Sequence, residues 1–318
     1  MKWYRYVLRR IGFIVLSLFV TSMLVFLLME IIPGDVAQVM LGQHATEEAL
    51  AALRTRMGLD NPWYVRYFGW LNQTLHGNLG ESMAFAGVKI APLVIHRAIN
   101  SILLLIACFV VFVPTSVIFG IIGGIKEEKW VSSFISISGL FMLAIPPFVT
   151  GVFLIYLFSQ VIPILPASSN IPPGTSIYQN LEVLILPTIC VSLLMFGYIA
   201  RMAQSSMNKV LKSSYIRTAV LKGLSQRYII FRHALKNAIL PTITVIGMNI
   251  GWLFGGLIVI EKLFGYPGIG QLLVISLESR DIPLVKVIIL LIVFVNLVAN
   301  FLTDLSYSLF DPRIDIRS

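Results

Sequence analysis

The stretch that decides the fold is Ser213–Pro241, SSYIRTAVLKGLSQRYIIFRHALKNAILP, a polar and basic connection between two strongly apolar segments. Residues 201–237 contain eight Lys and Arg and no Asp or Glu. Such an excess of basic residues is typical of a loop on the cytosolic side of a membrane protein. Within it, Ala219 and Gly223 are four positions apart, so on a helix they would share one face and leave it nearly bare. We expect this face to admit the backbone of another protein; the alternative is a solvated basic loop that only sets topology.

The composition indicates an integral membrane protein. Of the 318 residues, 57% are hydrophobic and only 12% are charged, whereas charged residues make up about 25% of soluble domains. The net charge of +9 comes from basic residues that lie beside apolar segments, and no nucleic-acid-binding signature accompanies them. We therefore expect these residues to set the orientation of the chain in the membrane. Cys108 and Cys190 lie within apolar runs and indicate neither a disulfide framework nor a metal site.

Six apolar segments are long enough to cross a hydrocarbon core, which takes about 20 residues. The first is longer than the core of a signal peptide and has no A-x-A-like exit, so we expect an uncleaved anchor. Six spans place both termini on one side, and the basic residues of the N-terminus and of 201–237 place that side in the cytosol. The predicted fold is all-α, with spans at approximately 11–32, 102–125, 134–161, 183–200, 239–260 and 287–309.

Two segments outside these spans predict short helices. Residues 46–57 have acidic residues in the first turn and are followed by Gly58, which predicts a helix that ends there. Residues 63–71, WYVRYFGWL, could dock on a partner, lie at the membrane surface or pack on the spans of the chain, and we favour packing. Residues 261–270 contain too many helix breakers to continue a span, so 271–281 predict a short external helix.

Proline and small or polar residues interrupt the spans. We expect kinks or local unwinding at Pro114, Pro146-Pro147 and Pro187, because each proline removes a backbone donor. Three glycines spaced by four form a groove that packs either within this chain or against a second subunit; they are Gly247, Gly251 and Gly255. Three asparagines either line a passage or join helices by hydrogen bonds, and we favour the second; they are Asn249, Asn296 and Asn300.

Several kinds of chemistry have no candidate centre. The sequence contains no G-x-x-x-x-G-K-[ST] loop for ATP phosphates, no H-E-x-x-H or close His/Cys cluster for a metal, and no G-x-S-x-G nucleophile. The acidic residues near membrane depth lie toward span ends, where they more often anchor a helix than relay protons; they are Glu30, Glu182, Glu261 and Asp304. We therefore expect no catalytic residue, no metal and no cofactor bound by this chain.

Four sequence patterns, in order, resemble those of binding-protein-dependent ABC permeases. Ala219-x-x-x-Gly223 followed by Ile239-Leu240-Pro241 is similar to the cytosolic signature of that family. Arg217 and Thr218 stand where Glu and Ala are usual, which resembles the peptide and nickel branch. The other three patterns resemble the same branch; they are Ile32-Pro33-Gly34-Asp35 with its later Gly-Leu-Asp-x-Pro turn, E-x-x-F-x-x-P-G-I-G from Glu261, and Asp311-Pro312-Arg313.

The resemblance implies a type I ABC importer permease fold. Residues 1–93 would form the N-terminal span and external region, 94–308 the permease core with its coupling loop at 201–237, and 309–318 a cytosolic tail. The resemblance also implies that the loop is a coupling helix in a cleft of an ATPase subunit. The docking residues would be Tyr215, Arg217, Thr218, Ala219, Lys222, Gly223 and Leu224.

The partners implied are a second related permease, two ATPase subunits that use ATP and Mg²⁺, an extracytoplasmic solute-binding protein and the lipid bilayer of a bacterial or archaeal inner membrane. The second permease would be contacted through the three glycines of the fifth span. Dipeptides or oligopeptides are the implied cargo, with nickel chelates, glutathione or opines as alternatives. A secondary carrier would need midplane carboxylates, and a membrane-embedded enzyme would need a convergent polar constellation.

Overall fold

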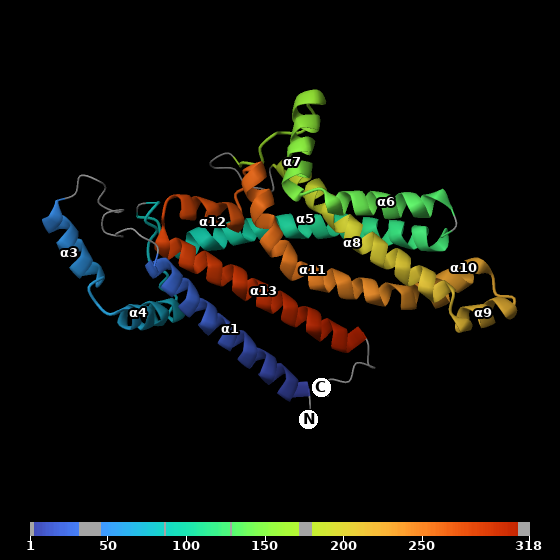
Figure 1. The fold of residues 1–318 in the computed structure, drawn as a ribbon, viewed down its shortest axis with the longest axis horizontal. Coiled ribbons are helices and arrows are strands. Elements are labelled where there is room, and N and C mark those ends of the chain that lie inside the picture. Colours follow the sequence, from blue (N-terminus) through green and yellow to red (C-terminus); the bar gives the residue numbers. More distant parts are fainter. Residues whose placement is uncertain (1–2, 32–45, 86, 128, 172–179, 311–318) are drawn as a thin grey trace. The chain divides into compact units, whose positions relative to one another are not determined.

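The computed structural model describes residues 3–31, 46–85, 87–127, 129–171 and 180–310. The motifs expected at 32–35 and 311–313 lie outside these residues. The chain divides into two compact units: unit 1 comprises Met1–Ile99 and Gly268–Leu297, and unit 2 comprises Asn100–Pro267 and Val298–Ser318. In the described ranges the regular elements are helices, beside one isolated bridge between Glu81 and Lys89 (Figure 1).

Unit 1 contains the N-terminal span and the external region. Its helices are α1 (Trp3–Ile31), α3 (Glu47–Met57), α4 (Trp63–Leu75), α12 (Ile269–Glu278) and the first parts of α5 (Ile90–Ile125) and α13 (Ile282–Phe310). Its core joins the start of α5 to α12 and α13, so the N-terminal turns of two spans pack on one short helix. The core residues are Ile90, Val94, Ile269, Leu272, Leu284, Val287 and Ile288.

The predicted helix at 46–57 is confirmed with its ends. Thr46 is extended, and its hydroxyl accepts a hydrogen bond from the Ala49 N–H at 3.3 Å. Gly58 ends α3 in the left-handed conformation, with φ of 66°. The short helix expected after residue 270 is also present as α12. Local capping chemistry was sufficient to define α3.

The aromatic stretch forms α4 and packs on α1, as predicted. Tyr67 is buried, and its hydroxyl lies 2.8 Å from Ser22 Oγ. Its ring meets the ring of Phe26 edge-on, with centroids 5.5 Å apart. Arg66 forms an ion pair with Glu30 near the end of α1. These contacts fix α4 against the second half of the first span.

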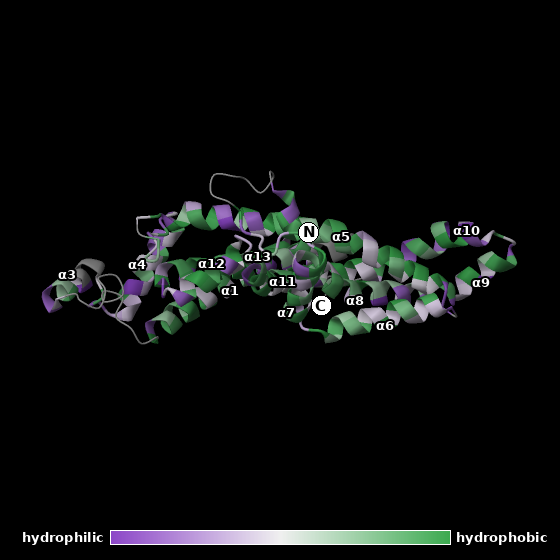
Figure 2. Cartoon of the chain, turned by 90° about the horizontal axis from the view of Figure 1, so that it is seen from above, coloured by the Kyte–Doolittle hydropathy of each residue, from purple (hydrophilic) through white to green (hydrophobic). Residues whose placement is uncertain are grey.

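Unit 2 is built around α8 (Ile185–Leu211), which packs against α6 (Trp130–Ala144), α7 (Pro147–Ile155) and α11 (Leu235–Phe264). Its main core includes Leu104, Met195, Ile199, Leu253 and Phe264. Hydrophobic residues are frequent along α5, α6 and α8 in Figure 2. Unit 2 also contains the later parts of α5 and α13 and the shorter helices η1 (Tyr156–Val161), η3 (Leu181–Leu184), α9 (Ser214–Leu221), α10 (Gln226–Tyr228) and η4 (Ile229–Ala234).

Five helices are long and apolar enough to cross a membrane, or up to seven spans if each of two bent helix pairs is counted as one. The six predicted spans correspond to α1, α5, α6 with α7 and η1, α8, α11 and α13. Helix α5 begins twelve residues before the predicted span at 102–125. The chain is therefore an all-helical, multi-pass membrane protein.

The prolines differ in their effect. At Pro146-Pro147 the span breaks, and the helices on its two sides are bent by 98°, as predicted. Helix α5 continues through Pro114. Pro187 is the third residue of α8 and follows directly on the 3-10 helix Leu181–Leu184, so it lies near the start of this span, and the kink expected there stays a prediction.

Candidate docking site on the basic loop

Helix α9 is the centre of the basic loop. Ser213 precedes it in an extended conformation, and the Arg217 N–H donates to the Ser213 carbonyl at 3.1 Å. The helix ends at Leu221, where the chain reverses through Gly223 with φ of 75°. There the Gly223 N–H donates to the Val220 carbonyl (2.9 Å) and the Leu224 N–H donates to the Ala219 carbonyl (3.4 Å). This pair of bonds is the Schellman pattern, in which a left-handed residue follows the last helical turn.

The predicted bare face of Ala219 and Gly223 is wrong. Gly223 lies beyond the helix end in a left-handed conformation, so the two residues are not one helical turn apart. Ala219 is only 8% exposed and points into the protein, whereas a Cβ on Gly223 would meet nothing within 4 Å. Gly223 therefore terminates the helix and does not form part of a face without side chains.

The inner face of α9 is fixed to the spans. Ala219 and Ile216 belong to a buried cluster with Met207 of α8 and with Ala238 of α11. Partly buried Ile121 and Ile125 from the end of α5 pack on the same cluster. The side-chain amide of Asn237 donates to the Tyr215 hydroxyl at 2.9 Å and so adds a polar link to α11. Helix α9 is therefore packed directly on α5, α8 and α11.

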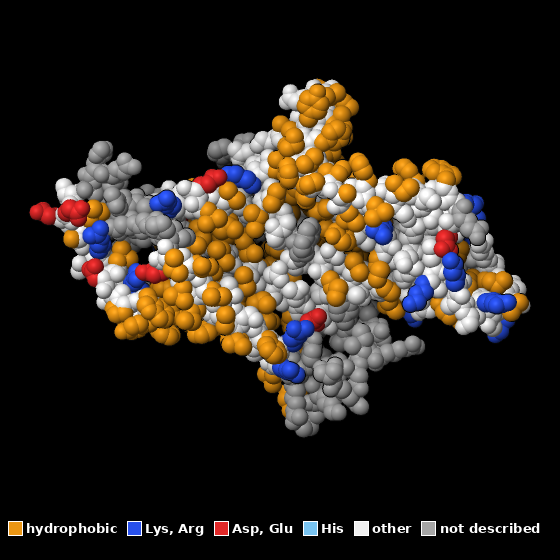
Figure 3. All heavy atoms as spheres, in the orientation of Figure 1, with side chains coloured by type: hydrophobic (Ala, Val, Ile, Leu, Met, Phe, Trp, Pro, Cys, Tyr) orange, Lys and Arg blue, Asp and Glu red, His pale blue; other side chains and the backbone are white. Residues whose placement is uncertain are grey.

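The outer face of α9 combines apolar and basic side chains. Val220, Leu221 and Leu224 are exposed, Leu221 by 80%, although they lie between two candidate spans and not within one. The exposed basic residues beside them are Arg217, Lys222 and Arg227. Figure 3 shows Lys and Arg side chains over the part of unit 2 that carries α9. Exposed apolar groups with a charged rim mark a protein contact surface.

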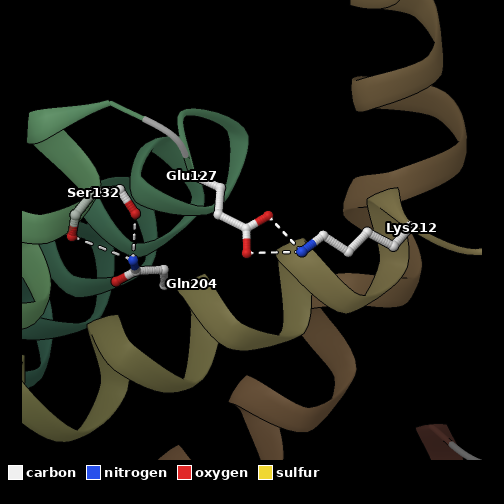
Figure 4. A network of polar contacts seen from close by, with 4 residues as sticks. All are labelled: Glu127, Ser132, Gln204 and Lys212. Carbon is white, nitrogen blue, oxygen red and sulfur yellow. Dashed lines mark hydrogen bonds and ion pairs between the residues drawn. The ribbon is translucent and has the colours of Figure 1, made fainter.

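Two polar links join the end of α5, the start of α6 and the last turns of α8, next to α9 (Figure 4). Gln204 of α8 donates from Nε2 to Ser132 Oγ at 2.7 Å, and its Oε1 accepts from Ser136 of α6 at 3.0 Å. Lys212 at the end of α8 pairs with Glu127, which follows α5, at 2.8 Å. Sequence reasoning missed Gln204, although Ser132 and Ser136 at a spacing of four mark a polar stripe on an apolar helix.

Glycines bring α8 close to its neighbours. A Cβ on Gly120 of α5 would lie 2.4 Å from the carbonyl oxygen of Ala200. A Cβ on Gly197 would lie 2.4 Å from the carbonyl oxygen of Gly139 in α6. Because these are backbone contacts, the three helices pack with no room for a side chain between them. The end of the bundle next to α9 is therefore a closely packed body.

The three glycines of α11 have different surroundings. A Cβ on Gly247 would lie 2.4 Å from Thr303 Cγ2, so this glycine packs within the chain against α13. Gly251 is buried. Gly255 is exposed and would meet nothing within 4 Å. Of the three, Gly255 has room for a second subunit.

The candidate pathway asparagines also differ. Asn249 of α11 donates to the Val245 carbonyl of its own helix at 2.7 Å. Asn296 is partly buried, and Asn300 is exposed. This bond of Asn249 stays within α11 and does not join two helices, so an interhelical or pathway role for the three asparagines stays a prediction.

The segment after α11 is held by buried hydrogen bonds. Ser101 Oγ donates to the carboxylate of Glu261 at 2.6 Å. The Tyr266 hydroxyl donates to the Asn100 carbonyl at 2.7 Å, and the Asn100 amide donates to the Pro267 carbonyl at 2.8 Å. Glu261 therefore anchors a helix end, as predicted for carboxylates in such positions.

A second buried carboxylate was missed from the sequence. Asp281 precedes α13 and accepts from the Leu284 N–H at 3.1 Å, which is the bond of an N-cap residue. Its other oxygen accepts from Ser82 Oγ, Met83 N and Ala84 N. The Asp-Ile-Pro sequence signals the cap, but nothing local signals the loop at 82–84.

This fold and site define a class: a multi-pass membrane protein that presents a helix, fixed to its spans, on a basic surface between them. Comparison with known proteins identifies the family. Residues 116–316 match the binding-protein-dependent transport system inner membrane component, and residues 3–93 match its N-terminal component. The chain belongs to this family of ABC importer permeases.

Relatives match over almost the whole chain. A probable peptide ABC transporter permease protein of Sinorhizobium fredii is 36% identical over 97% of this chain and 98% of its own. The glutathione transport system permease protein of Shigella flexneri is 33% identical over 97% of this chain and 98% of its own. As a transporter permease, the chain works with partner subunits.

Proposed function

We propose that this chain is the membrane-spanning subunit of an ATP-driven importer and forms, with a second related permease, the pathway for dipeptides or oligopeptides. The observation that carries the proposal is α9: its inner face packs on three spans, and Val220, Leu221 and Leu224 on its outer face remain exposed among basic residues. A helix so arranged can receive a force outside the bilayer and pass it to the pathway.

Two ATPase subunits, which bind and hydrolyse ATP with Mg²⁺, would supply that force. The outer face of α9 would occupy a cleft of one ATPase, with Arg217 and Lys222 at the rim of the contact. Since α9 shares a core with α5, α8 and α11, closure of the ATPase pair would tilt these spans. ATP can drive this change only if the two conformations of the permease bind the ATPase pair with different free energies.

The proposed orientation places both termini and α9 in the cytosol of a bacterium or archaeon, and α3 and α4 outside. It is supported by the eight basic residues of 201–237 and by the basic N-terminus. An extracytoplasmic solute-binding protein would deliver the cargo. Asn249, Asn296 and Asn300 remain the candidate residues of the pathway.

Peptides are the preferred cargo because the relative from Sinorhizobium fredii carries a peptide name over nearly the whole chain. Glutathione is the second candidate, since a relative named for glutathione matches with similar coverage. Uptake of a labelled dipeptide in cells with and without this chain, in competition with glutathione, separates the two. If uptake of the dipeptide does not depend on this chain, or if glutathione competes with it far better than unlabelled dipeptides do, glutathione is the favoured cargo.

Docking of α9 is tested by crosslinking from two single cysteines in the assembled complex in native membranes. Leu221→Cys places the thiol on the outer face, and Ala219→Cys places it on the buried face of the same helix. We expect the first to crosslink to an ATP-hydrolysing subunit and the second not to do so. If Leu221→Cys never reaches such a subunit, the proposed function fails.

A further inference from the structure

Helix α4 leaves an apolar flank uncovered outside the candidate spans. Tyr64, Phe68 and Leu75 are exposed, Phe68 by 58% and Leu75 by 76%. At 3.6 residues per turn these three positions fall within about 40° of one another, on one side of the buried Tyr67. Arg66 and Gln73 lie on the opposite side of Tyr67. The helix therefore has a buried edge toward α1, an apolar flank, and a third flank with Arg66 and Gln73 that also carries the exposed Trp63.

The contacts with α1 fix the depth of α4 relative to the bilayer. Tyr67 reaches Ser22, Arg66 reaches Glu30, and Phe26 packs on Tyr67 between these two levels. Glu30 is a charged residue near this end of the candidate span of α1, and Phe26 precedes it by four residues, which is a rise of about 6 Å. Helices that lie in a membrane interface are immersed by about 5–10 Å. The depth of α4 falls within this range.

The same contacts fix the rotation of α4. Arg66 extends toward Glu30 at the outer end of α1, whereas the Tyr67 hydroxyl reaches Ser22, two turns deeper. The flank with Arg66 and Gln73 thus faces the end of the span. The opposite flank, with Tyr64, Phe68 and Leu75, faces the middle of the bilayer. An interfacial helix needs this division, with polar groups toward water and apolar groups toward acyl chains.

Charged groups mark the same level on the neighbouring span. Lys286 lies four residues into α13, and its Nζ is 4.0 Å from the centroid of the Phe26 ring and 5.7 Å from that of Trp70. Lys and Trp side chains anchor spans at the membrane boundary, where the ammonium can reach the headgroups. The start of α13, the end of α1 and α4 therefore meet at one membrane interface.

We propose that α4 is an interfacial membrane helix, seated on α1 in the leaflet that contains Ile31, with Tyr64, Phe68 and Leu75 in contact with lipid acyl chains. The bilayer covers this flank, because the contacts of Tyr67 with Ser22 and Phe26 place α4 beside a candidate span, at the level of apolar residues of that span. The inference rests on the multi-pass membrane placement and not on the cargo or on the docking of α9.

Spin labels test the proposal in the full chain reconstituted in phosphatidylcholine–phosphatidylglycerol vesicles. Cys108 and Cys190, the two cysteines of the sequence, are first replaced by alanine. Labels are then placed at Phe68→Cys and Leu75→Cys, with Gln73→Cys on the opposite flank as the matched control. We expect oxygen, which partitions into lipid, to relax the labels at 68 and 75 several-fold more than a water-soluble nickel chelate does, and the reverse at 73.

Two outcomes would overturn the proposal. If the nickel chelate reaches position 68 as readily as position 73, α4 lies in water. If neither reagent reaches position 68, protein covers the flank.

A second measurement does not depend on the cysteine replacements. Phe68→Trp and Gln73→Trp, each in the otherwise unchanged chain, are compared in vesicles of lipids brominated near the top of the acyl chain. We expect the added fluorescence at 68 to be quenched at least twofold more than that at 73. Equal quenching at the two positions would contradict the inference.

Discussion

The carboxylate of Asp281 and the hydroxyl of Ser82 are joined by a hydrogen bond of 2.5 Å, although 199 positions separate them in the sequence. The same carboxylate oxygen accepts from two backbone N–H groups of the loop at 83–84, and the other oxygen caps α13. Asp281 is fully buried. One side chain thus holds the loop before α5 on the start of the last span.

Replacement of Asp281 should destabilise unit 1 strongly. Asp281→Ala removes the acceptor of four donors, and since buried donors without partners are costly, we expect a loss of about 3 kcal/mol. Ser82→Ala removes two bonds, the one donated to Asp281 and the one accepted from the Phe85 N–H, and should cost about 1–2 kcal/mol. Thermal unfolding of the purified chain in nanodiscs measures both. Equal unfolding temperatures for Asp281→Ala and the unchanged chain would show that the network contributes nothing.

Substitutions at Gly223 should separate the effect of backbone conformation on uptake from the effect of charge. Its φ of 75° disfavours residues with a Cβ, but Asn and Asp adopt this region more readily than Ala does. We expect Gly223→Ala to weaken the end of α9 by about 1 kcal/mol and to lower ATP-dependent uptake. Gly223→Asn should keep most of the uptake.

Gly223→Asp tests the proposed docking at the same position. It should abolish ATP-dependent uptake while insertion in the membrane stays intact, because the backbone tolerates it but a carboxylate alters the charge of the docking surface. Gly223→Asn is the isosteric control, and uptake is measured in cells at matched amounts of membrane-inserted chain. Normal uptake by the Asp variant would argue against docking at this end of α9.

Local sequence signals predicted the elements whose ends are determined locally. Thr46 and Gly58 delimit α3 by their own capping bonds, and Pro146-Pro147 breaks a span by steric exclusion. The start of α5 was missed because residues 90–101 contain polar groups that a hydropathy window penalises. Two of these groups are satisfied by distant partners: Arg97 bonds Gln271, and Asn100 bonds the Pro267 carbonyl.

The sequence predicted where the candidate docking helix lies in the chain, but not which of its side chains face outward. The position of α9 follows from its basic, polar sequence between two spans. A shared face of Ala219 and Gly223, however, needs a helix that continues through residue 223, and α9 ends two residues earlier, at Leu221. The bonds of Gln204 to α6 depend on a partner 72 positions away, which no local pattern identifies.

The two links drawn in Figure 4 should differ in energy. Gln204 and Ser132 are buried, whereas Lys212 and Glu127 are exposed. A double-mutant cycle of Gln204→Ala and Ser132→Ala should give a coupling free energy of about 1 kcal/mol, as for hydrogen bonds between membrane helices. The matched cycle of Lys212→Ala and Glu127→Ala should give about 0.3 kcal/mol, because solvent and salt screen exposed pairs. A larger coupling free energy for the ion pair than for the buried hydrogen bond would contradict this prediction.

The glycines of α11 separate packing within the chain from contact with a second permease. A Cβ at Gly247 would collide with Thr303, whose hydroxyl is already bonded to the carbonyls of Gly247 (3.1 Å) and Ala299 (2.8 Å), so this side chain cannot rotate away freely. Gly247→Ala should therefore destabilise the isolated chain by about 1–3 kcal/mol through overpacking. Gly255→Ala, which meets open space, should change its stability by no more than about 0.5 kcal/mol.

A larger residue at Gly255 then tests the proposed subunit contact. Gly255→Leu should leave the unfolding temperature of the isolated chain unchanged, because no atom of the described residues lies within 4 Å of a Cβ at this position. If a second permease packs there, the same variant should lower its recovery in a purification of the complex by tenfold or more, since close helix contacts exclude large side chains. Gly12→Leu, also in open space but on α1, is the control and should leave recovery unchanged. Full recovery with Gly255→Leu would place the contact between the two permeases on another surface of unit 2.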